Sequence, residues 1–127
     1  MGSRILVIDD EEAIRKSFIL AFEESEYQID TAESGEKGIE LERKGNYDLI
    51  FLDLKMPGLN GVETLHELRK LNADVPIYII TAFFEEFFEE LKEVERDGIK
   101  FELLRKPFSS EQIVLTANSV LNGPKGI

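Results

Sequence analysis

Five short apolar runs, separated by longer segments, constrain the fold of this chain more than any other feature. Most of the runs are continuously apolar instead of alternating with polar residues, as expected of parallel strands that are covered on both faces. The runs that we predict to be strands cover residues 5–8, 27–31, 49–52, 75–80 and 101–104, of which the second is the weakest.

The segments between these runs have the spacing and the capping residues of helices. Ser34 and Asn60 are placed to cap two of them, and Ser109 with Gln112 three residues later has the pattern of a capping box. The predicted helices cover residues 12–25, 35–44, 61–71, a segment that begins near 84, and a segment that Ser109 caps and that ends near Leu121 and Gly123. Five strands alternating with five helices predict an α/β fold with a doubly wound parallel sheet and right-handed crossovers.

Charge and composition argue against several classes of function. The chain of 127 residues carries a net charge of −11, whereas a nucleic-acid-binding protein needs a positive face for phosphate contacts. It has no cysteine, so disulfides and thiolate metal sites are excluded. No apolar run approaches the ~20 residues that span a bilayer, and no signal peptide opens the sequence. We therefore expect a cytoplasmic protein that contacts neither nucleic acid nor membrane.

Polar residues follow four of the five predicted strands. Their positions are Asp9 and Asp10 after the first strand, Asp53 after the third, Thr81 after the fourth and Lys106 after the fifth. Each has an ordinary explanation alone, since an Asp that follows a strand is usually a turn or cap residue. Because the carboxyl ends of parallel strands share one edge, where ligands bind in such sheets, their joint placement predicts a functional site.

This set of side chains suits phosphoryl transfer. Three neighbouring carboxylates repel one another unless a cation compensates, and ligands that are all oxygens suit Mg²⁺, or Mn²⁺ in its place. A carboxylate is also a competent nucleophile for forming an aspartyl phosphate. Asp53 stands alone at a strand end and is the expected nucleophile, whereas the adjacent Asp9 and Asp10 resemble metal ligands. Lys106 and Thr81 could then neutralise and hydrogen-bond the phosphoryl group.

Four sequence stretches make the chain similar to a known family. In order, they are "ILVIDDEEAIR", "LIFLDLKMPGLNGVE", "IYIITA" and "RKPF". Together they resemble the receiver domain of bacterial two-component response regulators over residues 3–122, which leaves residues 123–127 as a flexible tail. The resemblance implies a flavodoxin-like sheet with strand order 2-1-3-4-5 and five helices. It also implies a signalling domain that accepts phosphate rather than an enzyme.

The resemblance assigns a role to each polar residue of the predicted site. Asp53 would accept the phosphoryl group from a sensor histidine kinase. The Mg²⁺ ligands would be Asp10, Asp53 and the backbone carbonyl of Lys55, with Asp9 acting through water. The phosphoryl group would be bound by Thr81, the backbone of Ala82 and Lys106.

Other residues are candidates for a conformational switch, for control of phosphoryl hydrolysis and for binding of a partner. The switch position on the fifth strand falls at Leu103, and Phe101 lies two residues earlier on the same strand face. Lys55 and Phe83 flank the expected path of the water that would hydrolyse the phosphoryl group. The candidate kinase-docking residues are Ile14, Ser17, Phe18, Pro107 and Phe108.

The sequence leaves several alternatives for the role of this chain in a signalling pathway. Because few residues follow the last predicted helix, we expect a stand-alone regulator that signals through protein contacts. Lys55 and "LKMPG" make it most similar to the sporulation phosphorelay intermediate, which would imply a downstream phosphotransfer protein. It could instead be a truncated receiver of a longer transcriptional regulator, or a scaffold that is not phosphorylated. A phosphatase of the haloacid dehalogenase type would also use Mg²⁺ and an Asp nucleophile, but it carries D-x-D where this chain has adjacent Asp9 and Asp10.

Overall fold

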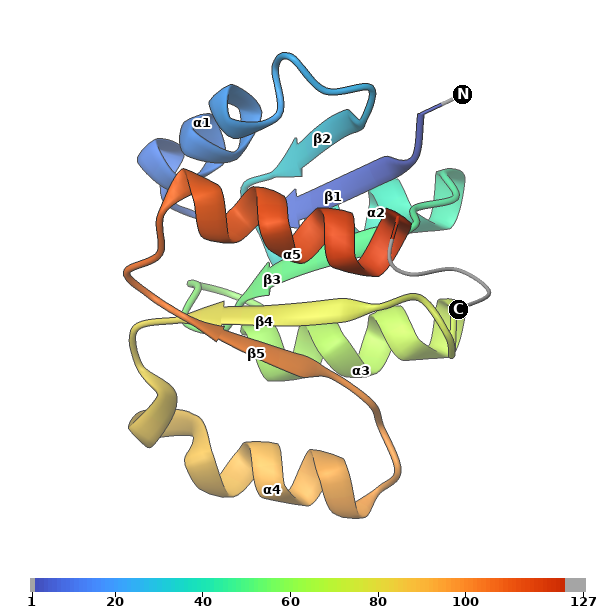
Figure 1. Cartoon of the computed structure of the whole chain (residues 1–127). Coiled ribbons are helices and arrows are strands. Elements are labelled where there is room, and N and C mark those ends of the chain that lie inside the picture. The colour runs from blue at the N-terminus through green and yellow to red at the C-terminus, as the bar shows by residue number, and fades with distance from the viewer. Residues whose placement is uncertain (1, 123–127) are drawn as a thin grey trace.

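A five-stranded parallel sheet forms the centre of the molecule (Figure 1). The computed structural model describes residues 2–122, so the predicted tail at 123–127 lies outside the described residues. The strands are β1 (Arg4–Ile8), β2 (Gln28–Ala32), β3 (Leu49–Asp53), β4 (Ile77–Thr81) and β5 (Glu102–Arg105). They lie in the order β2-β1-β3-β4-β5, and every neighbouring pair is parallel. The predicted doubly wound sheet and its strand order are confirmed.

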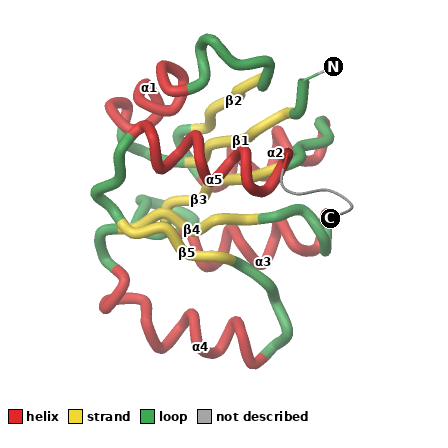
Figure 2. Tube along the Cα trace, in the orientation of Figure 1, coloured by secondary structure: helices red, strands yellow, loops and turns green. Residues whose placement is uncertain are grey.

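Helices cover both faces of this sheet (Figures 1 and 2). α1 (Glu12–Ala21) and α5 (Ser110–Asn122) lie on one face. The other face is covered by α2 (Gly35–Lys44), α3 (Gly61–Leu71) and α4 (Phe88–Arg96), the last preceded by a 3₁₀ turn, η1 (Phe84–Phe87). Among residues 2–122, no helix combines the length and the apolar character that a membrane span requires.

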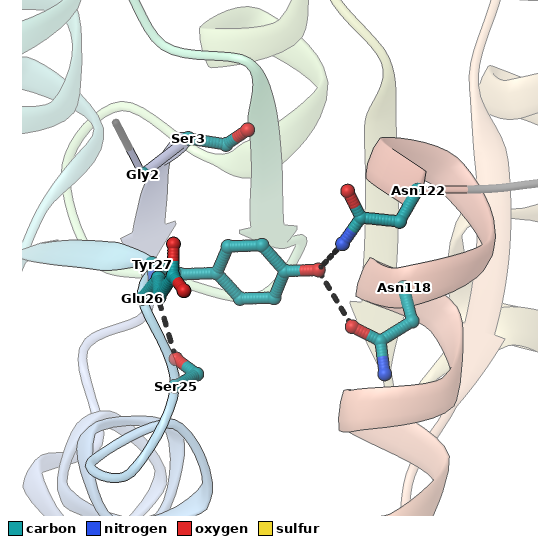
Figure 3. A pocket seen from close by; sticks show the side chains of 7 residues that line it. All are labelled: Gly2, Ser3, Ser25, Glu26, Tyr27, Asn118 and Asn122. Carbon is teal, nitrogen blue, oxygen red and sulfur yellow. Dashed lines mark hydrogen bonds between the residues drawn. The ribbon is translucent and has the colours of Figure 1, made fainter.

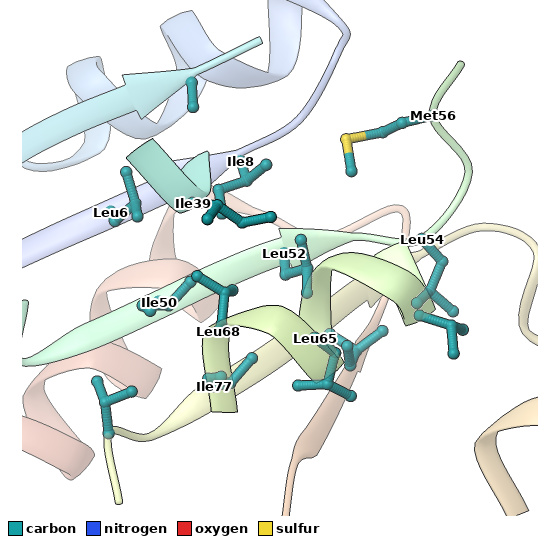
Figure 4. Packing of buried hydrophobic residues seen from close by; sticks show 14 of the residues in the cluster. Leu6, Ile8, Ile39, Ile50, Leu52, Leu54, Met56, Leu65, Leu68 and Ile77 are labelled. Carbon is teal, nitrogen blue, oxygen red and sulfur yellow. The ribbon is translucent and has the colours of Figure 1, made fainter. Parts of the chain in front are cut away.

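Two apolar clusters, one on each face, hold the layers together. All five residues of β3 are buried: Leu49 and Phe51 contribute to the cluster under α1 and α5, while Ile50 and Leu52 contribute to the other cluster (Figure 4). Full burial of one such side chain stabilises a fold by roughly 1.5–3 kcal/mol. The continuously apolar runs of the sequence therefore reflect strands that face a hydrophobic layer on both sides.

Side-chain caps define where three of the helices begin. The Ser34 hydroxyl accepts a hydrogen bond from the Lys37 backbone N–H at 3.1 Å. Asn60 and Glu63 form a reciprocal capping box at the start of α3, with bonds of 2.9 and 3.0 Å. Ser109 and Gln112 exchange equivalent bonds of 3.1 and 2.7 Å before α5. All three predicted caps are confirmed.

The predicted boundaries differ from the structure in a few places. α1 ends at Ala21 rather than at 25. The next residues form tight turns, in which a backbone N–H donates a hydrogen bond to the carbonyl three residues earlier. Phe22 nevertheless stays buried against Tyr27, with ring centroids 5.6 Å apart. β4 and β5 both begin and end later in the sequence than predicted. Thr81 is therefore the last residue of β4 rather than the first residue after it.

A polar hollow lies at the edge of the sheet where β1 begins (Figure 3). The Tyr27 hydroxyl donates a hydrogen bond to Oδ1 of Asn118 at 2.6 Å and accepts one from Nδ2 of Asn122 at 2.5 Å. These two bonds connect the last turns of α5 to the segment that leads into β2.

Candidate functional site

The polar residues predicted from the sequence gather at the carboxyl edge of the sheet. Asp9 follows β1 directly, Asp53 ends β3, Thr81 ends β4 and Lys106 follows β5. Strand pairing brings them side by side, because Asp53 pairs with Ile80 and the residue before Lys106 pairs with Thr81. The Lys106 backbone N–H then donates to the Thr81 carbonyl at 2.8 Å.

Three carboxylates converge at this edge. Asp9, Asp10 and Asp53 each offer one oxygen, and these oxygens all lie within 4.8 Å of one another. Asp9 and Asp53 are buried, with Asp53 only 3% exposed, whereas Asp10 is exposed. Buried at one end and open at the other, this group of oxygen donors fits a hard divalent cation such as Mg²⁺.

The ammonium of Lys106 reaches across the site to these carboxylates. Its Nζ lies 3.0 Å from Oδ2 of Asp9 and 3.4 Å from Oδ1 of Asp53. It also lies 3.2 Å from Oε1 of Glu11, a residue that the sequence did not single out. Glu11 follows the Asp pair directly, but residue types alone do not reveal a contact between positions 95 residues apart.

Burial and mutual repulsion alter the protonation of the cluster. Burial raises the pKa of the Asp53 carboxyl to about 7, with a further contribution from the charge of Asp9. Burial also raises the pKa of Asp9. For Lys106, burial alone would lower the pKa, but the charges of Asp53 and Asp9 outweigh it and raise the pKa above its ordinary value. The site therefore holds an excess of negative charge, which a cation would relieve.

Hydrogen bonds fix the turn between β1 and α1. Oδ1 of Asp9 accepts from the Glu11 backbone N–H at 2.9 Å. The Asp9 carbonyl accepts from Nη1 of Arg15 at 2.9 Å, and the Asp9 N–H donates to the Ala32 carbonyl at 3.0 Å. These contacts hold the Asp9 side chain towards Lys106 and Asp53.

Thr81 and the segment after it form the opposite wall. The buried Thr81 hydroxyl accepts a hydrogen bond from the Phe83 N–H at 2.8 Å, so its own hydrogen can still be donated to a ligand. Nζ of Lys55 lies 4.2 Å from the centre of the Phe83 ring and 3.2 Å from Oε1 of Glu86. Lys55, two residues past Asp53, thus contacts the turn that follows β4. Ala82 lies between Thr81 and Phe83 and is exposed.

One predicted docking residue is wrong. Phe18 is 0% exposed and packs on Phe51 and Phe108, with ring centroids 4.8 and 5.7 Å away, so it cannot contact a partner. The helical spacing that placed it with Ile14 and Ser17 also describes the side of α1 that faces the sheet. Ile14, Ser17 and Phe108 are half-buried and Pro107 is exposed, so these four remain candidates.

The two candidate switch residues share an environment. Phe101 and Leu103 are both half-buried and both pack against the apolar cluster under α2, α3 and α4, as the strand alternation predicts. Leu103 lies within β5, whereas Phe101 precedes it.

Comparison with known proteins gives a consistent match. The family model of the response regulator receiver domain matches residues 5–118. "Transcriptional regulatory protein ResD" of Bacillus subtilis is 38% identical over 119 residues, which cover 94% of this chain and 48% of that protein. "Cell cycle response regulator CtrA" of Brucella ovis is 29% identical over 126 residues, or 97% of this chain and 52% of that protein. This chain thus spans about half the length of these curated relatives.

Solved structures support the same family. The structure of Vibrio cholerae chemotaxis protein CheY4 superimposes with a TM-score of 0.82 at 26% identity. That match covers 95% of this chain and 100% of the other.

Proposed function

Because this chain belongs to the response regulator receiver domains of two-component systems, we propose that it accepts a phosphoryl group on Asp53 from a sensor histidine kinase. The observation that carries the proposal is the position of Asp53. Its carboxylate ends a central strand beside two other carboxylates and the Lys106 ammonium. The receiver domain would extend over residues 3–122 of a cytoplasmic protein.

Receiver domains typically bind Mg²⁺ at an acidic pocket, and the residues here fit that ion. Asp10, Asp53 and the backbone carbonyl of Lys55 would hold it, with Asp9 contributing through water. The bound ion would supply positive charge that offsets both the carboxylates and the phosphoryl oxygens.

The side chains of this protein would carry out the transfer itself. One carboxylate oxygen of Asp53 attacks the phosphorus atom of the donor, and a new O–P bond forms. The bond from phosphorus to the donor breaks, and its electron pair leaves with the donor's imidazole nitrogen or, for acetyl phosphate, with acetate. Lys106, Thr81 and the backbone N–H of Ala82 donate hydrogen bonds to the phosphoryl oxygens, on which charge develops.

Chemical phosphorylation tests this proposal. With acetyl phosphate and MgCl₂, intact-mass measurement should show the addition of one phosphoryl group to the wild type. Asp53→Ala should remain unmodified because it lacks the nucleophile. Asp97→Ala is the matched control, since this carboxylate lies at the far end of α4 and should not affect labelling. Labelling of Asp53→Ala at the wild-type rate would refute the assignment.

The relatives favour a second possibility for the output. "Transcriptional regulatory protein ResD" and "Cell cycle response regulator CtrA" are about twice as long as the part that this chain matches. The chain would then be the receiver of a longer transcriptional regulator. The stand-alone regulator that signals by protein contacts, and the relay intermediate with a downstream phosphotransfer protein, remain the other proposals. Sequencing the complete gene distinguishes the first from the other two.

A further inference from the structure

Glu11 contacts the site without belonging to its metal-binding group. Its carboxylate lies 3.2 Å from Nζ of Lys106, yet its side chain is 60% exposed. Among residues 2–122, the acidic group placed to hold an ion consists of Asp9, Asp10 and Asp53. Glu11 is also the N-cap residue, one position before α1 begins, but its side chain does not cap that helix. Within residues 2–122, the side-chain contact that the Glu11 carboxylate makes is therefore the ion pair with Lys106.

The three donors of the Lys106 ammonium are all in use. A lysine ammonium has three N–H groups, and here they contact Asp9, Glu11 and Asp53. If Lys106 is to bind a phosphoryl oxygen, one of these contacts must be given up. Asp9 and Asp53 are both buried, and the other oxygen of Asp9 is held by the Glu11 N–H. Glu11 is the exposed partner, and its side chain can rotate into solvent.

We propose that Glu11 is a positioning residue that holds the Lys106 ammonium in the unphosphorylated protein and thereby slows phosphoryl transfer to Asp53. The inference rests on the proposed function of Asp53. Releasing Lys106 from Glu11 precedes its contact with the phosphoryl group, so a chain without this contact should react faster. An exposed ion pair is weak, and its loss should change the rate about two- to fivefold.

Two variants of Glu11 separate the contact from the charge. Glu11→Gln removes the charge. Glu11→Asp keeps the charge but shortens the side chain, and an Asp at the N-cap favours hydrogen bonds to the first N–H groups of the helix over reaching outward. Glu12→Gln is the matched control, because Glu12 is the next residue, is 72% exposed and pairs with Lys16 at 3.6 Å rather than with Lys106.

The experiment has a kinetic and a spectroscopic part. Intact-mass kinetics with acetyl phosphate and saturating MgCl₂ should show labelling about two- to fivefold faster in both Glu11 variants, and at the wild-type rate in Glu12→Gln. In the absence of Mg²⁺ and phosphodonor, NMR of the Lys106 ammonium should show faster proton exchange with water in the same two variants. A purely structural role for Glu11 would not change that exchange rate.

Three results would overturn the inference. Equal acceleration by Glu11→Gln and Glu12→Gln, with Glu11→Asp at the wild-type rate, would mean that only the charge matters. Slower labelling of Glu11→Gln would mean that Glu11 assists the transfer. Identical rates and identical ammonium exchange in all four proteins would refute the contact while leaving the proposed function intact. If the wild type is not labelled at all, the proposed function fails as well.

Discussion

At the scale of single residues, Asp53 illustrates what a sequence reveals about a site. A charge at the end of a continuously apolar run is unusual, and the structure places this carboxylate almost out of contact with solvent. Asp9, Thr81 and Lys106 were predictable for the same reason, since each follows or ends a strand. Glu11 was not, because its contact with Lys106 depends on the direction of a long side chain, which residue spacing does not encode.

Phe83 and Lys55 allow a prediction about the lifetime of the phosphoryl group. The Lys55 ammonium lies over the exposed Phe83 ring and also contacts Glu86, so these side chains form a cover beside the site. If they exclude attacking water, Phe83→Ala should shorten the phosphoryl lifetime about two- to fivefold, which is the scale of an exposed cation–π contact.

Phe88→Ala provides the control for that lifetime measurement. The Phe88 ring is similarly exposed, at 38% against 45% for Phe83, but it contacts Lys92 rather than Lys55. Following the decay of phosphorylated protein by intact mass should therefore give the wild-type lifetime for Phe88→Ala. A longer lifetime in Phe83→Ala would contradict the proposed cover.

At the scale of helices and strands, the accuracy of the predictions followed the strength of the local signal. The starts of α2, α3 and α5 were correct because a capping side chain binds N–H groups that the helix leaves free. The end of α1 was wrong by four residues, since nothing local marks the point where tight turns replace the helix. Strand ends were shifted because pairing with a neighbouring strand, and not residue type, decides them.

The bonds of Tyr27 allow a prediction about the packing of α5. Tyr27→Phe removes the hydroxyl that connects Asn118 and Asn122 to the start of β2, so the free energy of unfolding should fall by about 1 kcal/mol. Urea denaturation of Tyr27→Phe, Asn118→Ala and the double variant measures the coupling between these side chains. If the two single effects simply add, the hydroxyl does not stabilise α5 through Asn118.

At the scale of the whole molecule, the fold was predictable because every level of the sequence agrees with it. Apolar runs, helical spacing and caps all indicate the same alternation of strands and helices. The assignment of helices to faces was not explicit in the sequence. It depends on which helices pack against each side of a strand. In β3, Leu49 and Phe51 face one group of helices, whereas Ile50 and Leu52 face the other.

The charge of the site makes the stability of the whole domain depend on pH. An Asp in an unfolded chain has a pKa of about 3.9, whereas burial raises the pKa of Asp53 to about 7. Between these values the folded protein binds more protons than the unfolded one, so the free energy of unfolding falls as pH rises. In EDTA, the wild type should lose about 2–3 kcal/mol between about pH 5 and pH 8.

Replacing the carboxyl group tests the source of this pH dependence. Urea denaturation of Asp53→Asn should show a clearly shallower decline over the same pH range, because the group that loses its proton is gone. Asp97→Asn, at the exposed end of α4, should decline as steeply as the wild type. An equally steep decline in Asp53→Asn would place the effect on other groups.

The order of the strands in the sheet also bears on how the domain forms as it leaves the ribosome. β1, β2 and β3 are the first three strands made, and β1 lies between the other two in the sheet. β4 then adds beside β3, and β5 adds beside β4. Each new strand thus finds its partner already synthesised, and no strand has to insert between two that are already paired. At a synthesis rate of roughly 5–20 residues per second, the first half of the chain has several seconds in which to assemble before the last strand emerges.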